Sequence, residues 1–263
     1  MTNRLSSQKT ELAKAFDTIE EDAVHYSESM ERLLSLCFDS SELKDKTILD
    51  LGCGPGISTY LLGLKGIKSI IGIDISPQRL EIARSLSKKH DVTNSDFLIA
   101  DISDLPIKHQ STDITLAIQS LNYPQNPMQA IDEIIRISKK KTTIILIALK
   151  KTKLDPLYEL IRKICAFFPE KTHIFIAKFI SFLFLPLIPL ILRRKVSSKK
   201  GKKIYLTILE AFFVPAKLYK FKPEELMTYF ADKGFDVIEI PPPSPSIDFF
   251  SPSNSFLLKI IRG

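Results

Sequence analysis

A short apolar run that leads into three glycines at alternate positions restricts the fold of this chain more than any other feature. The segment, residues 48–56, reads ILDLGCGPG, and a helix is predicted directly after it at 57–64. Glycine tolerates a left-handed backbone and lets a ligand approach without meeting a Cβ atom. The free N–H groups at the start of the helix would face that ligand with positive potential. The segment therefore predicts a strand, turn and helix arranged around a ligand.

Strands and helices alternate through much of the chain. Apolar runs predict strands at 47–51, 69–75, 96–100, 113–119 and 142–149, and helical spacing predicts helices at 77–89 and 128–138. A helix that begins near Lys222 and strands at 235–240 and 256–261 resume the pattern later. Near-continuous apolar strands separated by helices are typical of a parallel sheet covered on both faces. We therefore predict an α/β fold.

An acidic residue ends the second predicted strand. Asp74 follows Gly56 by 18 residues, and an acid in this position can accept hydrogen bonds from both hydroxyls of a ribose. Ile75 beside it could pack on an adenine ring. The glycine spacing, G-x-G-x-G, differs from the G-x-G-x-x-G of dinucleotide sites. Strand, glycines, helix and acid together favour a bound ligand over a glycine turn without one.

Four segments carry a family resemblance. ILDLGCGPG, GIDIS, LIADISDLP and STDITLAIQ resemble, in this order, the motifs of class I S-adenosylmethionine-dependent methyltransferases. The resemblance covers residues 46–150 and 222–262. It implies a Rossmann-like, seven-stranded, mostly parallel sheet with helices on both faces, an antiparallel last strand and S-adenosyl-L-methionine as the cofactor.

The resemblance also implies roles for individual residues. Asp50 and the backbone of Gly52, Cys53, Gly54 and Gly56 would hold the methionyl part of the cofactor, and Gln119 would line the pocket near the sulfonium.

At the other end of the cofactor, Asp74 would hold the ribose. Asp101 would face the adenine amino group, and the backbone of Ile102 would contact a ring nitrogen. The position of Asp101 agrees with this role, because it ends an apolar strand and the carboxyl ends of strands line the ligand crevice in open α/β sheets. A helix cap or turn is the alternative role for Asp101.

The sequence predicts three parts. Residues 1–45 would form an N-terminal helical cap, and residues 46–150 with 222–263 would form the cofactor-binding methyltransferase domain. Residues 151–221 would form a hydrophobic and basic helical insertion after the fifth strand, because strand–helix alternation stops there.

No acid–base set stands out, so we assign no catalytic residue and predict no metal site. Cys53 has the size of a filler in the glycine turn, which we prefer to a reactive thiol. Tyr123 lies in SLNYP, which departs from the Asn/Asp-Pro-Pro-Tyr motif of amino-group methyltransferases. This departure argues against DNA bases and glutamine as substrates. The three cysteines are few and widely spaced, which fits a reducing compartment.

Charge and hydropathy point to a partner. The formal net charge is +7, and residues 193–203 hold seven basic residues and no acidic one. Because the rest of the chain is formally neutral, we expect no nucleic-acid partner, which would need basic residues spread over a face. The basic run follows residues 174–192, which are apolar apart from Lys178. As a helix this run would extend about 28 Å, close to the thickness of a bilayer core.

Three interpretations of the apolar run are open. It could dip into a membrane surface, form a lid or dimer helix of a soluble protein, or span the bilayer. Pro186 and Pro189 would interrupt a spanning helix, and one crossing would separate residues 222–262 from their sheet. The basic run favours the first interpretation, because anionic headgroups would attract it.

We therefore expect a methyltransferase that acts on an apolar small molecule, such as a lipid, quinone or isoprenoid-linked compound. The polar N-terminus lacks the apolar core of a signal peptide, so we expect a cytoplasmic protein that is peripheral at an anionic membrane. One alternative is a soluble small-molecule methyltransferase in which the insertion is a lid or a homodimer element. The other is a non-catalytic protein that binds S-adenosylmethionine.

Overall fold

A computed structural model describes residues 23–153, 155–156, 160, 219–241 and 255–263. Contacts divide the chain into two compact units, Met1–Thr18 with Thr152–Leu218 and Ile19–Lys151 with Tyr219–Gly263. All the strands described below belong to the second unit. The predictions for the N-terminal residues 1–22 and for the apolar and basic runs at 174–203 lie outside the described residues.

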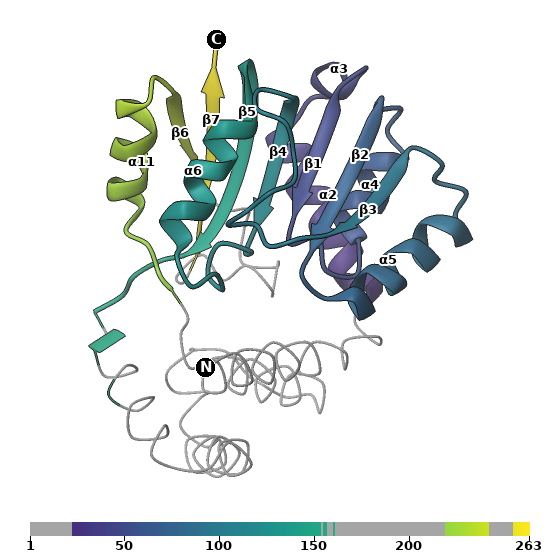
Figure 1. Ribbon diagram of the computed structural model, residues 1–263, viewed down its shortest axis with the longest axis horizontal. Helices are drawn as coiled ribbons and strands as arrows, with labels where there is room; N and C mark the ends of the chain where they lie inside the picture. The colour runs from purple at the N-terminus through teal and green to yellow at the C-terminus, as the bar shows by residue number, and fades with distance from the viewer. Residues whose placement is uncertain (1–22, 154, 157–159, 161–218, 242–254) are drawn as a thin grey trace. The chain divides into compact units, whose positions relative to one another are not determined.

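A seven-stranded sheet forms the centre of the second unit (Figure 1). Its strands are β1 (Thr47–Leu51), β2 (Ser69–Asp74), β3 (Ser95–Ile99), β4 (Thr112–Ile118), β5 (Ser138–Leu149), β6 (Asp236–Ile240) and β7 (Ser255–Arg262). Their order is β3-β2-β1-β4-β5-β7-β6. Strands β1 to β5 pair in parallel, and β7 lies antiparallel between β5 and β6. This topology confirms the Rossmann-like fold predicted from the sequence.

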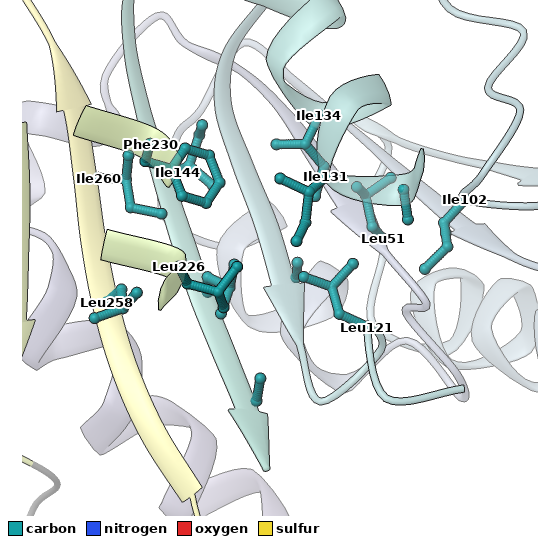
Figure 2. Packing of buried hydrophobic residues seen from close by; sticks show 14 of the residues in the cluster. Leu51, Ile102, Leu121, Ile131, Ile134, Ile144, Leu226, Phe230, Leu258 and Ile260 are labelled. Carbon is teal, nitrogen blue, oxygen red and sulfur yellow. The ribbon is translucent and has the colours of Figure 1, made fainter. Parts of the chain in front are cut away.

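Helices cover both faces of the sheet. The bounds of the described helices are α2 (Ala23–Cys37), α3 (Ser40–Leu43), α4 (Ile57–Gly63), α5 (Pro77–Lys89), α6 (Pro127–Ile137) and α11 (Pro223–Asp232). One core packs α6 and α11 against the sheet, with Ile131, Ile134, Leu226 and Phe230 facing residues of β1, β5 and β7 (Figure 2). A second core on the opposite face packs α2 and α4 against Ile48, Ile70 and Ile145.

The alternation of side chains along each strand explains the two cores. Ile48 packs on one face, whereas its neighbours Leu49 and Leu51 pack on the other. Since successive side chains of a strand point to opposite faces, a strand buried on both sides must be apolar throughout. The near-continuous apolar runs that predicted the strands follow from this packing.

One strand begins earlier than predicted. Strand β5 starts at Ser138 instead of residue 142, directly after α6. Ser138 pairs with Thr112, and Lys139 forms an ion pair with Asp113 at 2.9 Å. The three lysines at 139–141 concealed this extension, because a strand was predicted only where the apolar run begins.

No helix within the described part of the chain has the length and apolar character needed to cross a membrane. Within the same residues, no three His, Cys, Asp or Glu side chains gather in a way that could hold a metal ion.

Candidate functional site

The sheet order brings the predicted site residues to one edge. The glycine loop follows β1, Asp74 ends β2, Asp101 lies just after β3 and Gln119 just after β4. These four strands are consecutive neighbours in the order β3-β2-β1-β4 and run in parallel. Their carboxyl ends therefore lie side by side, which is where ligands bind in open α/β sheets.

The three glycines of the loop have different surroundings. All three have a left-handed backbone, with φ of 68° at Gly52, 55° at Gly54 and 82° at Gly56. A Cβ atom at Gly52 would lie 2.5 Å from the Cβ of Ser120, and one at Gly56 would lie 2.6 Å from the Cβ of Ala83. Close packing within the protein therefore requires Gly52 and Gly56.

Gly54 differs from the other two glycines. A Cβ atom there would meet only the end of the Arg79 side chain, at an ordinary distance of 3.6 Å. The fold itself leaves room for a side chain at this position. An open position in a glycine loop at the carboxyl end of β1 is what close approach of a ligand to the backbone requires.

The Asp74 carboxylate fastens the glycine loop to β2. Its Oδ2 accepts a hydrogen bond from the Gly54 N–H and its Oδ1 accepts one from the Ser76 N–H, both at 2.9 Å. The N–H groups of Gly52 and Cys53 donate to the Ile73 carbonyl at 2.7 and 2.9 Å. Each carboxylate oxygen can accept two hydrogen bonds, so Asp74 retains capacity for ribose hydroxyls, and that role stays a prediction.

Asp50 is more deeply enclosed. The residue is 1% exposed, and its Oδ2 accepts hydrogen bonds from the Ser58 and Thr59 hydroxyls at 2.5 and 2.7 Å. Burial raises the pKa of this carboxyl above its ordinary value, against the lowering effect of the two hydroxyls. Asp50 thus joins β1 to the first turn of α4, and its contact with the methionyl group stays a prediction.

Cys53 packs inside the loop. Burial raises the pKa of its thiol well above the ordinary value, and the carboxylates of Asp50 and Asp74 raise it further. The thiolate is the nucleophilic form of cysteine, so this environment suits a packing role.

Asp101 and Ile102 lie in the loop that follows β3. Asp101 is exposed, and its Oδ1 accepts a hydrogen bond from the Ser103 N–H at 2.9 Å, which forms a local turn. The Ile102 side chain points into the core near Leu51 and Leu121 (Figure 2), so only its backbone remains for a ligand.

An ion pair on α6 fixes the continuation of this loop. The Leu105 N–H donates to Glu133 Oε2 at 2.8 Å, and Arg136 donates to the carbonyls of Leu105 and Ile107 at 3.0 and 2.9 Å. The Arg136 guanidinium, 2.6 Å from Glu133, lowers the pKa of that carboxyl.

The segment after β4 adopts an unusual backbone. Gln119 has a φ of 54°, and its N–H donates to the Ile147 carbonyl at 2.8 Å. Ser120, the next residue, is buried beside Gly52, and its hydroxyl has no hydrogen-bond partner within the described residues.

Asn122 joins this segment to both ends of the insertion. The residue is 1% exposed. Its side-chain oxygen accepts a hydrogen bond from the Leu149 N–H at 3.3 Å, and its side-chain nitrogen donates to the Tyr219 carbonyl at 2.7 Å. The Tyr219 N–H donates back to the Asn122 carbonyl at 2.8 Å, and Lys150 pairs with Phe221. We call Asn122, Leu149–Lys151 and Tyr219–Phe221 the insertion stem.

Sequence reasoning missed three residues at this edge. The guanidinium of Arg79, in the first turn of α5, lies 3.8 Å from the Asp74 carboxylate. Because a cation at a helix N-terminus is unfavourable by itself, the position of Arg79 in the sequence could have indicated an acidic partner. Ser120 could have been found as the residue that follows Gln119. Nothing in the sequence indicated Asn122, since its partners lie far along the chain.

Comparisons with known proteins agree with this geometry. The methyltransferase domain family matches residues 42–212. Ajmaline N-methyltransferase of Rauvolfia serpentina is 30% identical over 135 residues, which cover 49% of this chain and 46% of the relative. Ribosomal protein L11 methyltransferase of Photobacterium profundum is 31% identical over 105 residues, which cover 39% and 34%. The chain therefore spans less than half the length of these two curated relatives.

Solved structures share the fold. Magnesium protoporphyrin IX methyltransferase from Synechocystis PCC 6803, solved with S-adenosylmethionine bound, superposes with a TM-score of 0.57 at 14% identity and covers 97% of each chain. An S-adenosylmethionine-dependent methyltransferase from Aquifex aeolicus superposes with a TM-score of 0.50 at 14% identity, and the match covers 90% of this chain and 98% of the other. With its family match over more than half of its length, the chain belongs to the class I S-adenosylmethionine-dependent methyltransferases, whose cofactor is S-adenosyl-L-methionine.

Proposed function

We propose that this chain transfers a methyl group from S-adenosyl-L-methionine to an apolar small molecule, such as a lipid, quinone or isoprenoid-linked compound, at an anionic membrane surface. The cofactor supplies a methyl group on a positively charged sulfur. Methyl transfer requires alignment of donor and acceptor, and it requires a base only when the acceptor must lose a proton. The proposal therefore does not depend on a catalytic acid–base pair.

The main observation in support of a cofactor site is the free space at Gly54, where a Cβ atom would meet only the end of the Arg79 side chain. The adjacent groups suit the parts of the cofactor. Asp74, tied to the Gly54 N–H, would accept the ribose hydroxyls. Ile75 is 42% exposed directly after β2 and offers an apolar surface to the adenine ring. Asp101 and the Ile102 backbone would bind the edge of that ring, and Gln119 would lie near the sulfonium.

Alanine substitutions at two glycines that both have a left-handed backbone test this site. Gly54 and Gly66 have φ values of 55° and 69°, and neither has a neighbouring atom closer than 3.6 Å to a Cβ position. Alanine should cost both variants a similar left-handed strain of about 1–2 kcal/mol. Gly54→Ala should also weaken S-adenosylmethionine binding in calorimetry by more than about tenfold, which is roughly 1.4 kcal/mol, and Gly54→Val should abolish it.

Gly66→Ala should bind the cofactor as the wild type does. Unchanged affinity in both Gly54 variants would overturn the site assignment. Asp74→Ala is a weaker test, because it would also release the Gly54 N–H from β2.

The substrate proposal rests on the sequence of the insertion. An apolar run at 174–192 followed by seven basic residues at 193–203 suits an interfacial element. Each basic residue near an anionic surface contributes about 1 kcal/mol, so the cluster is strong enough to decide localisation. The name of the ajmaline N-methyltransferase, which is similar over 49% of this chain, supports a small-molecule substrate.

Vesicle binding tests the membrane part. Replacing the seven basic residues of 193–203 by Gln should reduce binding to anionic vesicles much more than binding to neutral ones, because the apolar run would still insert. Deleting 174–203 should remove vesicle binding and retain cofactor binding, since the glycine loop, Asp74 and Asp101 lie outside the deletion. An intact protein that ignores anionic vesicles at low salt would favour a lid, or a homodimer element if it self-associates.

Turnover tests the activity itself. The protein should transfer a labelled methyl group from the cofactor to a component of extracted lipids, and mass spectrometry would identify the acceptor. Cofactor binding without transfer to lipid extracts or soluble metabolites would favour a non-catalytic binding protein.

A further inference from the structure

A group of lysines lies at the edge of the sheet opposite the proposed cofactor site. Strands β2, β1, β4 and β5 are neighbours in this order and run in parallel, so their amino ends lie side by side. The segments at these ends, 44–47, 65–69, 108–113 and 138–141, contain eight lysines and two acidic residues. We call these segments the lysine edge. It carries an excess of six positive charges across three strand spacings, or about 14 Å.

Contacts between the segments hold the lysine edge together. The Lys68 N–H donates to the Lys46 carbonyl at 3.1 Å. The Asp113 carboxylate accepts hydrogen bonds from the Thr47 N–H at 3.1 Å and from Lys139 Nζ at 2.9 Å. Lys139 therefore offsets the charge of Asp113. Among the described residues, none of the other seven lysines has an ion-pair partner.

The lysine edge contrasts with the charge of the chain as a whole. Apart from residues 193–203, the chain is formally neutral. At the lysine edge, six of the eight lysines are exposed and the other two, Lys46 and Lys139, are half-buried. Like charges this close repel one another and destabilise the folded state. A partner with negative charge would relieve that repulsion.

The lysine edge is too far from the cofactor site to assist it. From Lys141 to Leu149, β5 extends about 26 Å, which is about three Debye lengths at physiological ionic strength. The insertion also leaves the sheet at the far end of β5, where Leu149–Lys151 and Tyr219–Phe221 meet. The lysine edge therefore suits a partner other than the cofactor, the methyl acceptor or a membrane bound by the insertion.

The residue types favour an acidic protein over nucleic acid. The planar fork of arginine matches phosphate groups, and aromatic side chains stack on bases, whereas lysine offers a hydrated point charge. The four segments of the lysine edge contain no Arg, Phe, Tyr or Trp. We propose that the lysine edge binds an acidic surface of a partner protein. Such charge pairs steer association and weaken as salt is added.

Binding of poly-L-glutamate to the full-length chain tests this inference. The seven basic residues of 193–203 are first replaced by Gln, which removes their own affinity for anions and leaves a formally neutral protein. This protein should still bind poly-L-glutamate at low salt. The affinity should fall by about tenfold or more when the salt is raised to about 0.5 M.

Two double variants on the same strand locate the binding. Lys140→Glu with Lys141→Glu should weaken poly-L-glutamate binding by about tenfold or more. Lys151→Glu with Lys153→Glu makes the same change of charge beyond the other end of β5, and its affinity should stay within about twofold. Neither pair should lower the thermal midpoint, because all four side chains are exposed.

Four outcomes would overturn the proposal. These are a parent protein that does not bind poly-L-glutamate, and equal losses of affinity in the two double variants. Tighter binding of a thymidine oligonucleotide of equal charge would assign the lysine edge to nucleic acid instead. In the chain with its basic run intact, a loss of anionic-vesicle binding confined to Lys140→Glu with Lys141→Glu would assign it to a membrane.

Discussion

The two halves of the ligand edge are built in different ways. On the β1–β2 side, the glycine loop is held by residues close in sequence, with Asp74 binding the Gly54 N–H across 20 residues. On the β4–β5 side, Asn122 binds the Tyr219 carbonyl across 97 residues. The β1–β2 half is therefore a local unit, whereas the β4–β5 half, beside the insertion, is completed only when distant chain segments meet.

This difference implies that the halves can be perturbed separately, except where they touch. They touch at Gly52, against the Ser120 side chain. Four sets of variants test the comparison.

The largest effect is expected at this contact. Gly52→Ala would place a Cβ atom 2.5 Å from that of Ser120, on a backbone with a φ of 68°. Overpacking and left-handed strain together should lower the free energy of unfolding by about 3 kcal/mol. Gly66→Ala carries the strain without the clash and should lose only about 1–2 kcal/mol. Urea denaturation measures both, and equal losses would contradict the proposed contact.

The insertion stem should be separable from cofactor binding. Asn122→Ala would leave the Leu149 N–H and the Tyr219 carbonyl without their side-chain partner, at a cost of about 2–3 kcal/mol. Amide exchange at Leu149 should accelerate, while cofactor affinity should stay within about threefold of the wild type.

Asn126→Ala is the control for Asn122→Ala. It removes a cap of α6 and should cost about 1 kcal/mol without changing exchange at Leu149. A large loss of cofactor affinity in Asn122→Ala would show that the halves are coupled.

The ion pair under the β3 loop adds a pH dependence. Arg136 lowers the pKa of Glu133 below its ordinary value of 4.5. A carboxylate with a lowered pKa stabilises the folded state above its unfolded pKa, and the contribution is lost as the pH falls through the folded pKa. Glu133→Gln should therefore cost about 1 kcal/mol at pH 7, and the difference from the wild type should shrink below about pH 4.5. A difference that stays constant down to pH 3 would contradict this assignment.

The smallest effect on stability is expected at Ile75. Because the side chain is 42% exposed, Ile75→Ala should change the free energy of unfolding by less than about 0.5 kcal/mol. Loss of its contact with adenine should weaken cofactor binding by about 1 kcal/mol, or roughly fivefold. Ile82→Ala, at a 41% exposed position on α5, should leave affinity unchanged. Equal affinities in the two variants would remove Ile75 from the site.

The same contrast explains what the sequence could predict. The strands, the glycine loop and the position of Asp74 were predictable, because each depends on a pattern within a few residues. The tie from Asp74 to the Gly54 N–H was not, because it depends on how two loops meet. The packing that requires Gly52 and Gly56 was hidden as well, since Ser120 and Ala83 come from other elements.

Long-range contacts account for most of what was missed. Asn122 reads as an ordinary loop residue until Tyr219 lies beside it. Ser138 reads as the end of a helix until Thr112 pairs with it. Both depend on the assembled sheet, which a local pattern does not contain.

The place of β7 in the sheet has a consequence for synthesis of the chain. Strand β7 covers the β5 edge from Thr142 to Leu149, yet β5, the apolar run 174–192 and β6 all leave the ribosome before it. Until β7 arrives, that edge exposes unpaired backbone groups beside apolar side chains, which favours association with other nascent chains. Dependence on chaperones should therefore be greatest between the emergence of Leu149 and that of Arg262, and slower translation of this interval should increase aggregation.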